Sequence, residues 1–197
     1  MIGAIIQARM NSSRLPKKIL ANLNGVSLLE HLINRTEKIK ELDKIIIAMT
    51  DDPSDDPLEE FAIKNNYLFF RGNTNNVLQR YIDCAEQFSI DLILRICGDS
   101  PLMDAKTASS MINMLNNCKA DYCGINSDYS CAATGFEVFT LNALKKQLTN
   151  NLKQHHLEHV SLYMRESSDF IKCNIIPDEE LRIDDLRLTV DTPADLD

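Results

Sequence analysis

Four basic side chains follow the first apolar segment of the chain. Arg9, Arg14, Lys17 and Lys18 lie in a loop without Asp or Glu, although the whole chain carries a net charge of −8. A guanidinium can bind two oxygens at once and an ammonium is a mobile point charge, so this mixture suits a polyphosphate. The spacing fits neither GxxxxGK[ST] nor GxGxxG, which argues against a P-loop and a dinucleotide-binding unit. The loop is therefore predicted to bind an anion, with a solvated basic turn as the alternative.

The elements around this loop should place acidic groups beside it. Residues 2–8 are apolar and β-branched, as in a buried strand, and the loop leaves the carboxyl end of that strand. Ligands of open α/β sheets bind at that edge. Asp99 follows a second apolar strand and Gly98, and Asp191 follows residues 188–190 in the same way. We expect both carboxylates near the basic loop.

Strand and helix patterns alternate along the chain. Alternation of this kind predicts an α/β fold, a three-layer α/β/α sandwich with a mostly parallel central sheet and an antiparallel addition among the later strands. Strands are expected at 2–8, 44–50, 67–71, 92–97, 120–125, 136–141, 172–176 and 187–190. Helices are expected from the capping box at Ser27 to about 40, at 58–65, over 77–85, from an Asp104 cap to 115, and from 140 or 142 to 148.

Composition limits the classes of protein. The 197 residues are predicted to form a single domain, 1–197, without a linker. The acidic balance argues against nucleic-acid binding, and no apolar run is long enough for a membrane span or shaped like a signal peptide. We therefore expect a cytoplasmic protein that binds neither. The six cysteines show no CxxC pair and are expected to be reduced thiols rather than zinc ligands.

Several further segments match a known family in order along nearly the whole chain. Together with IIQARMNSSRLPKK at 5–18, they are AMTD at 48–51, RG at 71–72, NVLQRY at 76–81, RICGDSPL at 95–102, GFEVF at 135–139, EHV at 158–160 and TVDTP at 189–193. On these segments the chain resembles the cytidylyltransferases that activate acidic sugars as CMP conjugates, among them acylneuraminate and deoxy-manno-octulosonate cytidylyltransferases. It resembles most the spore coat polysaccharide biosynthesis protein F branch.

This resemblance implies a fold, a reaction and a set of roles. The fold would be that of nucleotide-diphospho-sugar transferases, and the reaction a transfer of CMP from CTP to an acidic or amino sugar acceptor with release of pyrophosphate. Mg²⁺ is the implied cofactor, and the resemblance is compatible with a homodimer. The implied roles are catalysis at the phosphates for Arg9, Arg14 and Lys18; nucleotide binding for Ala8, Ser12, Ser13, Asp51, Arg71 and Arg80; acceptor binding for Glu137 and His159; and metal binding for Asp99 and Asp191.

Several of these residues have a structural alternative. Ser12 and Ser13 are also typical turn residues, and Asp51 before Asp52-Pro53 is also a plain Asx turn. Asp191 could instead belong to a helix start at 192–195. The helical Arg80 could form a surface salt bridge with Glu86. His159, at helical spacing from Leu162 and Tyr163, could be a structural histidine.

Three features depart from the family pattern. Lys17 stands where the family commonly has glycine, residues 126–134 differ from its acceptor loop, and the chain ends at Asp197 within an expected helical turn. The last feature predicts a C-terminally truncated chain or a longer natural protein. Two other functions stay open: a nucleotide-sugar-dependent glycosyltransferase, although Gly98-Asp99-Ser100 lacks the Asp-x-Asp motif, and a catalytically silent nucleotide-binding module.

Overall fold

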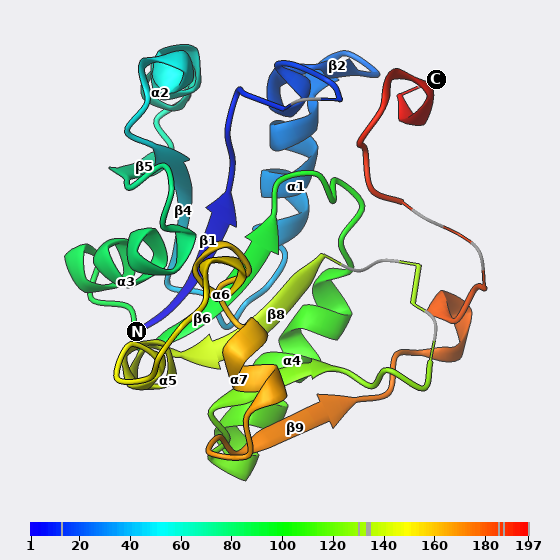
Figure 1. Cartoon of the computed structure of the whole chain (residues 1–197). Helices are drawn as coiled ribbons and strands as arrows, with labels where there is room; N and C mark the ends of the chain where they lie inside the picture. Colours follow the sequence, from blue (N-terminus) through cyan, green and yellow to red (C-terminus); the bar gives the residue numbers. More distant parts are fainter. Residues whose placement is uncertain (13, 130, 133–134, 185, 187, 197) are drawn as a thin grey trace.

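A seven-stranded sheet forms the centre of the protein (Figure 1). The computed structural model describes all residues except 13, 130, 133–134, 185, 187 and 197. The strand order is β5-β4-β1-β6-β8-β7-β9, and every neighbouring pair is parallel except the two pairs made by β8. The strands are β1 Ile2–Gln7, β4 Lys44–Thr50, β5 Leu68–Gly72, β6 Leu92–Cys97, β7 Tyr122–Ile125, β8 Phe136–Thr140 and β9 Lys172–Ile175; β2 Asn22–Leu23 and β3 Val26–Ser27 form a separate ribbon.

Helices cover both faces of the sheet, which confirms the predicted three-layer α/β/α architecture (Figure 1). Along β1, Ile6 belongs to the core beneath α1, α2 and α4, while Ile5 belongs to the core beneath α3, α5 and α7, as expected when successive side chains point to opposite faces. The helices are α1 Leu28–Thr36, α2 Asp56–Lys64, α3 Val77–Gln87, α4 Ala105–Cys118, α5 Leu141–Gln147, α6 Gln154–Glu158 and α7 Leu162–Glu166, with short 3₁₀ turns η1 Lys18–Leu20, η2 Pro53–Asp55, η3 Glu179–Leu181 and η4 Pro193–Asp195.

The helix starts predicted at Ser27, 77, Asp104 and 140 are confirmed, whereas the helix expected from 58 begins at Asp56. At α1, the Ser27 hydroxyl accepts a hydrogen bond from the Glu30 N–H at 3.2 Å, and the Glu30 carboxylate accepts from the Ser27 N–H at 2.9 Å. The Ser27 hydroxyl, which also donates to Glu30, lowers the pKa of that carboxyl. Asn76 caps α3 through the Gln79 N–H, and Asp104 caps α4 through the Thr107 N–H. No helix within the described ranges is long and apolar enough to cross a membrane.

Two predicted elements differ most from the structure. The helix expected to reach about 40 ends at Thr36, because the Lys38 N–H turns back to the Arg35 carbonyl in a tighter, 3₁₀-type bond. The strand expected at 187–190 is not present at 188–190: the Val190 N–H bonds to the Asp99 carbonyl in the loop after β6, instead of joining a strand ladder. Residue 187 lies outside the described residues. Extended, apolar sequence therefore serves here to tie two loops together.

Candidate functional site

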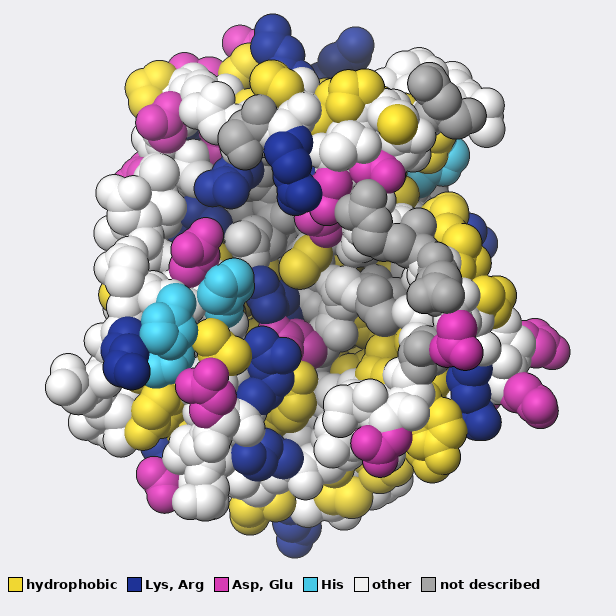
Figure 2. Space-filling view, turned by 45° about the vertical axis from the view of Figure 1, so that its right-hand side comes forward, with side chains coloured by type: hydrophobic (Ala, Val, Ile, Leu, Met, Phe, Trp, Pro, Cys, Tyr) yellow, Lys and Arg dark blue, Asp and Glu magenta, His cyan; other side chains and the backbone are white. Residues whose placement is uncertain are grey.

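A hollow of about 210 Å³ lies at the carboxyl ends of β1 and β6. Figure 2 shows a hollowed face on which basic and acidic side chains lie side by side. The hollow therefore lies at the same edge of the sheet at which the sequence predicts ligand binding. The hollow is lined by Gln7, Ala8, Arg9, Ser12, Arg14, Lys18, Ile19, Cys97, Gly98, Asp99 and Asp191.

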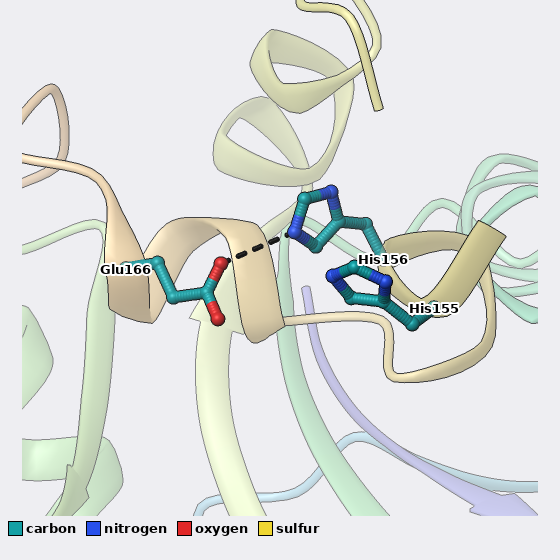
Figure 3. Close-up of side chains that lie close together, drawn as sticks. All are labelled: His155, His156 and Glu166. Atoms are coloured by element: carbon teal, nitrogen blue, oxygen red, sulfur yellow. Dashed lines mark hydrogen bonds and ion pairs between the residues drawn. The ribbon is translucent and has the colours of Figure 1, made fainter. Parts of the chain in front are cut away.

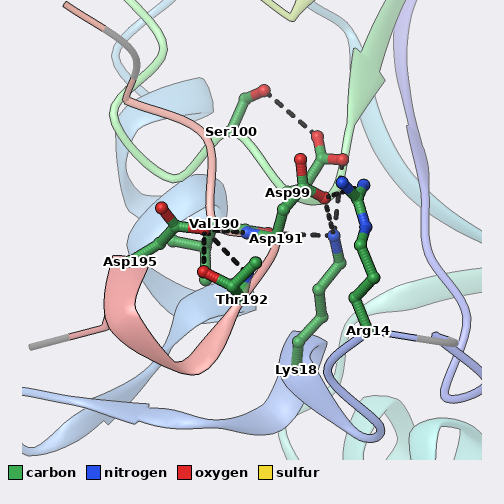
Figure 4. Close-up of polar contacts among 8 residues, drawn as sticks. All are labelled: Arg14, Lys18, Asp99, Ser100, Val190, Asp191, Thr192 and Asp195. Atoms are coloured by element: carbon green, nitrogen blue, oxygen red, sulfur yellow. Dashed lines mark hydrogen bonds and ion pairs between the residues drawn. The ribbon is translucent and has the colours of Figure 1, made fainter.

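Two cations and two carboxylates from three distant segments meet in this hollow (Figure 4). The Lys18 Nζ lies 3.0 Å from Asp191 Oδ1 and 3.5 Å from Asp99 Oδ2, and Arg14 approaches the same Asp191 oxygen at 2.9 Å. We call Arg14, Lys18, Asp99 and Asp191 the ion cluster. Lys18 and Asp191 are largely shielded, with side-chain exposures of 14% and 15%, whereas Arg14 is 64% exposed. The basic loop and both predicted carboxylates are thus brought together.

Close backbone contacts hold the segments of the ion cluster in place. The Gly98 N–H donates to the Gln7 carbonyl at 2.9 Å, and a Cβ at position 98 would lie 2.7 Å from that oxygen. Only glycine therefore fits between the ends of β1 and β6. The Val190 N–H, bonded to the Asp99 carbonyl at 2.8 Å, fixes Asp191 against the loop that carries Asp99.

A buried carboxylate that the sequence analysis missed anchors the basic loop. Asp55, fully buried in η2, accepts hydrogen bonds from the Met10 N–H at 2.6 Å and from the Thr50 N–H and hydroxyl at 2.8 and 2.5 Å. It thereby links the loop after β1 to the end of β4. The local pattern Asp-Asp-Pro-Ser-Asp indicates only a turn, because it cannot reveal that the partner of Asp55 is Met10, 45 residues away.

Lys17 has the backbone conformation that its position in the family pattern suggests. Its φ is 62°, in the left-handed region that favours glycine, and its N–H donates to the Met10 carbonyl at 2.9 Å. The loop thus keeps the glycine-type turn despite the lysine. The Lys17 side chain is exposed and is not part of the lining of the hollow.

A second hollow of about 200 Å³ adjoins the first. Its lining is polar apart from one valine, and it shares Gln7 and Arg9 with the first hollow. Asp51 does not line it but accepts hydrogen bonds from the Thr74 N–H and hydroxyl at 3.1 and 2.6 Å, and the hydroxyl lowers the pKa of Asp51. Asp51 thus orders Thr74. The lining consists of Gln7, Arg9, Thr74, Asn75, Val77, Gln154 and Glu158.

The two arginines predicted to bind nucleotide, Arg71 and Arg80, lie outside both linings. Arg71 bonds to Asp56 at 2.7 Å, to Glu59 at 2.6 Å and to backbone carbonyls, so its guanidinium fastens β4 and β5 to α2. Arg80 is 1% exposed and donates to the Asn73 carbonyl at 3.0 Å; burial lowers its pKa. The surface salt bridge with Glu86 considered for Arg80 is wrong, because Glu86 instead pairs with Lys145.

Glu137 is buried beneath the site rather than facing either hollow. Its carboxylate pairs with Arg95, its cross-strand neighbour on β6, and accepts from the Ser161 hydroxyl at 2.7 Å. The other arm of the Arg95 guanidinium donates to the Gln7 Oε1 at 3.2 Å. Glu137 therefore reaches the lining through Arg95 and Gln7, which are both absent from the predicted site residues.

The three histidines of 155–159 are not part of the lining of the second hollow. His159 is exposed at the end of α6 and lines neither hollow, whereas its neighbour Glu158 lines the second. His155, His156 and Glu166 lie close enough together to suggest a metal site (Figure 3). However, His156 Nδ1 accepts from the Lys153 N–H, so its proton is on Nε2, which donates to Glu166 at 3.1 Å. Nδ1 thus helps to cap the start of α6, and Nε2 joins α6 to Glu166 of α7, so both ring nitrogens of His156 are already used.

The remaining lining residues add little reactive chemistry. Cys97 lines the first hollow, but burial raises the pKa of its thiol, so the sulfur stays protonated and is a poor nucleophile. Ala8 and Ser12, two of the predicted nucleotide-binding residues, line the first hollow, and Ser13 lies outside the described residues. What the site offers is therefore charge: cations that can bind phosphate oxygens and carboxylates that can bind a divalent cation.

Comparison with known proteins identifies the family. The cytidylyltransferase family model matches residues 3–190. The chain is similar to the spore coat polysaccharide biosynthesis protein SpsF of Bacillus subtilis, with 32% identity over 97% of this chain and 81% of that one. It is 28% identical to an 8-amino-3,8-dideoxy-manno-octulosonate cytidylyltransferase of Shewanella frigidimarina over 70% of this chain and 54% of the other.

The solved structures agree with the sequence comparison. A cytidylyltransferase from Leptospira borgpetersenii serovar Hardjo-bovis is 31% identical and superimposes with a TM-score of 0.89 over 98% of this chain and 82% of its own. The match therefore extends over nearly the whole chain. On the extent of the family match and these identities, the chain belongs to the cytidylyltransferase family.

Proposed function

We propose that this protein transfers CMP from CTP to an acidic or amino sugar, with release of pyrophosphate, as an activation step in surface polysaccharide biosynthesis. The observation that carries the proposal is the ion cluster: two cations and two carboxylates gathered in one hollow at the carboxyl edge of the sheet. The names of the relatives, SpsF and an amino-sugar-acid cytidylyltransferase, support the acceptor class. A cytoplasmic location fits a CTP-dependent step and stays a prediction, as does the homodimer.

The cations would act on the triphosphate. In this reaction an acceptor oxygen attacks the α-phosphorus while the bond to pyrophosphate breaks, so negative charge grows on the leaving group. Lys18 and Arg14 lie in the hollow where they can meet that charge. Arg9 is exposed, lines both hollows, and forms no ion pair within the described part of the chain, so its guanidinium is available to phosphate oxygens.

Asp99 and Asp191 fit the Mg²⁺ that this reaction class implies. Their carboxylates already face one positive charge, the Lys18 ammonium, from two sides. Carboxylate oxygens are the ligands that Mg²⁺ takes from proteins, usually one or two at a time. When bound there, Mg²⁺ would offset the charge of the triphosphate and of the departing pyrophosphate.

The second hollow is proposed to hold the nucleoside. Thr74 and Asn75 offer hydroxyl and amide groups to a base or ribose, and Asp51 keeps Thr74 in place. For Glu137 we propose a positioning role: by holding Arg95 it fixes Gln7 with Oε1 turned inward, which leaves the amide N–H₂ to face the ligands. An acceptor-binding role for His159 has no support from its position.

Phosphorus NMR of the products tests the reaction class. The protein is incubated with CTP, Mg²⁺ and a panel of sugar acids and amino sugars, and the proposal predicts pyrophosphate together with a new phosphodiester signal. With nucleotide sugars as donors, a nucleoside diphosphate product would instead favour a glycosyltransferase. Bound CTP without turnover of any sugar in the panel would favour the silent module.

A pair of variants links turnover to the ion cluster. Asp99→Asn should lower the rate at least about a hundredfold if its charge is needed in the transition state. Asp178→Asn is the matched control, because Asp178 lies in an exposed ion pair with Lys106 away from the hollow. Equal rates for the two variants would contradict the proposed role of Asp99.

A further inference from the structure

The Lys18 ammonium lies between the carboxylates of Asp99 and Asp191, where a divalent cation would bind. Its Nζ donates to Asp191 Oδ1 at 3.0 Å, to the Val190 carbonyl at 2.9 Å and to Asp99 Oδ2 at 3.5 Å (Figure 4). An ammonium has three N–H donors, and all three are directed at this wall of the hollow. In this state the Lys18 ammonium therefore offers no donor to a phosphate group.

The same carboxylates cannot serve both cations at once. A divalent ion bound to Asp99 and Asp191 would meet the Lys18 ammonium only a few ångströms away, in a partly shielded place where like charges repel strongly. Lys18 has a long, flexible stem, so it can leave if another anion takes its charge. The phosphates of a nucleotide are such an anion.

We propose that Lys18 acts as an internal counter-ion that keeps the metal site closed until a nucleoside triphosphate is bound. The nucleotide draws the ammonium, together with the exposed Arg14, away from the carboxylates and thereby frees them for Mg²⁺. Metal and triphosphate then bind as a coupled pair, each raising the affinity for the other by the same factor. This inference rests on the proposed function, since it assigns the hollow to the triphosphate and its metal.

The proposal gives one substitution two effects of opposite sign. Lys18→Met keeps a side chain of similar length without the charge. Divalent metal alone should then bind about tenfold tighter or more, because the cation that contacts both carboxylates is gone and only the exposed Arg14 still pairs with Asp191. CTP should bind about tenfold weaker or more, because its phosphates lose a charge-assisted contact. A residue that merely supports the fold would not strengthen one ligand while it weakens the other.

Mn²⁺ serves as the probe, because its free and bound forms are distinguished by electron paramagnetic resonance. The titration uses wild type, Lys18→Met and Lys18→Gln, which is an uncharged polar alternative should the methionine variant fold poorly. Lys17→Met is the matched control: it removes a neighbouring exposed lysine that is not part of the lining. The double variant Lys18→Met/Asp99→Asn checks that the additional Mn²⁺ binding occurs at Asp99 and Asp191.

The expected result is weak Mn²⁺ binding by wild type and Lys17→Met, and clearly tighter binding by the Lys18 variants that is lost with Asp99→Asn. Equal Mn²⁺ affinity in all lysine variants would overturn the proposal, as would tighter binding that persists in the Asp99→Asn double variant. CTP titration of the same proteins distinguishes a failure of this inference from a failure of the proposed function. If wild type binds CTP while the Lys18 variants gain no Mn²⁺, the inference fails and the proposed function stands. If wild type binds no triphosphate, the proposed function fails, and with it the coupling inferred here.

Discussion

Asp55→Asn should destabilise the protein strongly, although it changes one oxygen into a nitrogen. Asp55 is fully buried and all three of its partners are donors: the Met10 N–H, the Thr50 N–H and the Thr50 hydroxyl. Asparagine keeps a single oxygen. If that oxygen stays with Thr50, the amide N–H₂ faces the Met10 N–H, so one charge-assisted bond is lost and two buried donors oppose each other.

The cost follows from those contacts. A hydrogen bond to a charged group contributes about 1.5–3 kcal/mol, and an unsatisfied buried donor costs about 1–3 kcal/mol. The lost hydrogen bond and the unsatisfied donor are partly the same effect, so the two figures are not added in full. We expect the free energy of unfolding to fall by about 3 kcal/mol. In urea, with a slope near 2 kcal/mol per molar, the midpoint should fall by about 1.5 M.

Urea unfolding followed by circular dichroism measures this shift. Glu60→Gln, the same chemical change at an exposed position of α2, is the control and should leave the midpoint within about 0.3 M of wild type. An Asp55→Asn midpoint within that same range would refute the reasoning. It would mean that the contacts to Met10 and Thr50 do not hold the basic loop.

Three further substitutions test other parts of the structure. Lys17→Gly should raise the free energy of unfolding by about 0.5–1 kcal/mol, because relief of the left-handed backbone exceeds the entropic cost of glycine. Glu137→Gln should lower it by about 3 kcal/mol, because the buried charge of Arg95 loses its partner. Ser27→Ala should cost about 1 kcal/mol at pH 7 through loss of the α1 cap. Since the Ser27 hydroxyl lowers the folded-state pKa of Glu30 below 4.5, this Ser27 deficit should shrink as the pH falls below that value.

Each of these has a result that would contradict it. A less stable Lys17→Gly protein would mean that the lysine side chain stabilises the loop by contacts of its own. Unchanged stability in Glu137→Gln would show that the Arg95 pair contributes nothing beyond its cost of burial. A Ser27→Ala deficit that stays constant from pH 7 to pH 3 would contradict the link between Ser27 and Glu30. All three are read from urea unfolding, with the last repeated across the pH range.

The strands and the basic loop could be predicted because their signals are local. Residues 44–50 and 92–97 are apolar, β-branched runs, and the structure has strands at those bounds. Since the carboxyl ends of parallel strands share one edge of a sheet, the proximity of Asp99 to Lys18 also followed from the sequence. Arg14 and Asp191 complete the ion cluster and were also among the predicted site residues, but Asp191 was expected to follow a strand that is not present at 188–190, and its predicted role came from the family resemblance.

The residues that the sequence analysis missed or misassigned depend on contacts between distant parts of the chain. Arg80 looks like a surface residue of an amphipathic helix, but α3 is pressed against the sheet and the Asn73 carbonyl takes one of its N–H groups. Asp55 looks like a turn residue until its bond to Met10 is seen. Residues 188–190 have strand composition, yet Val190 bonds to a loop. Local propensity cannot show which of several possible partners a polar group will find.

Nucleotide binding measured by isothermal titration calorimetry tests the central claim most directly. Wild-type protein is titrated with CTP, UTP, ATP and GTP, each with Mg²⁺, and with CTP after removal of the metal by a chelator. A cytidylyltransferase built around this ion cluster should bind CTP in preference to the other three, and more tightly with Mg²⁺ than without it. Binding of a purine nucleotide in preference to CTP, or no binding of any triphosphate by folded protein, would contradict the account.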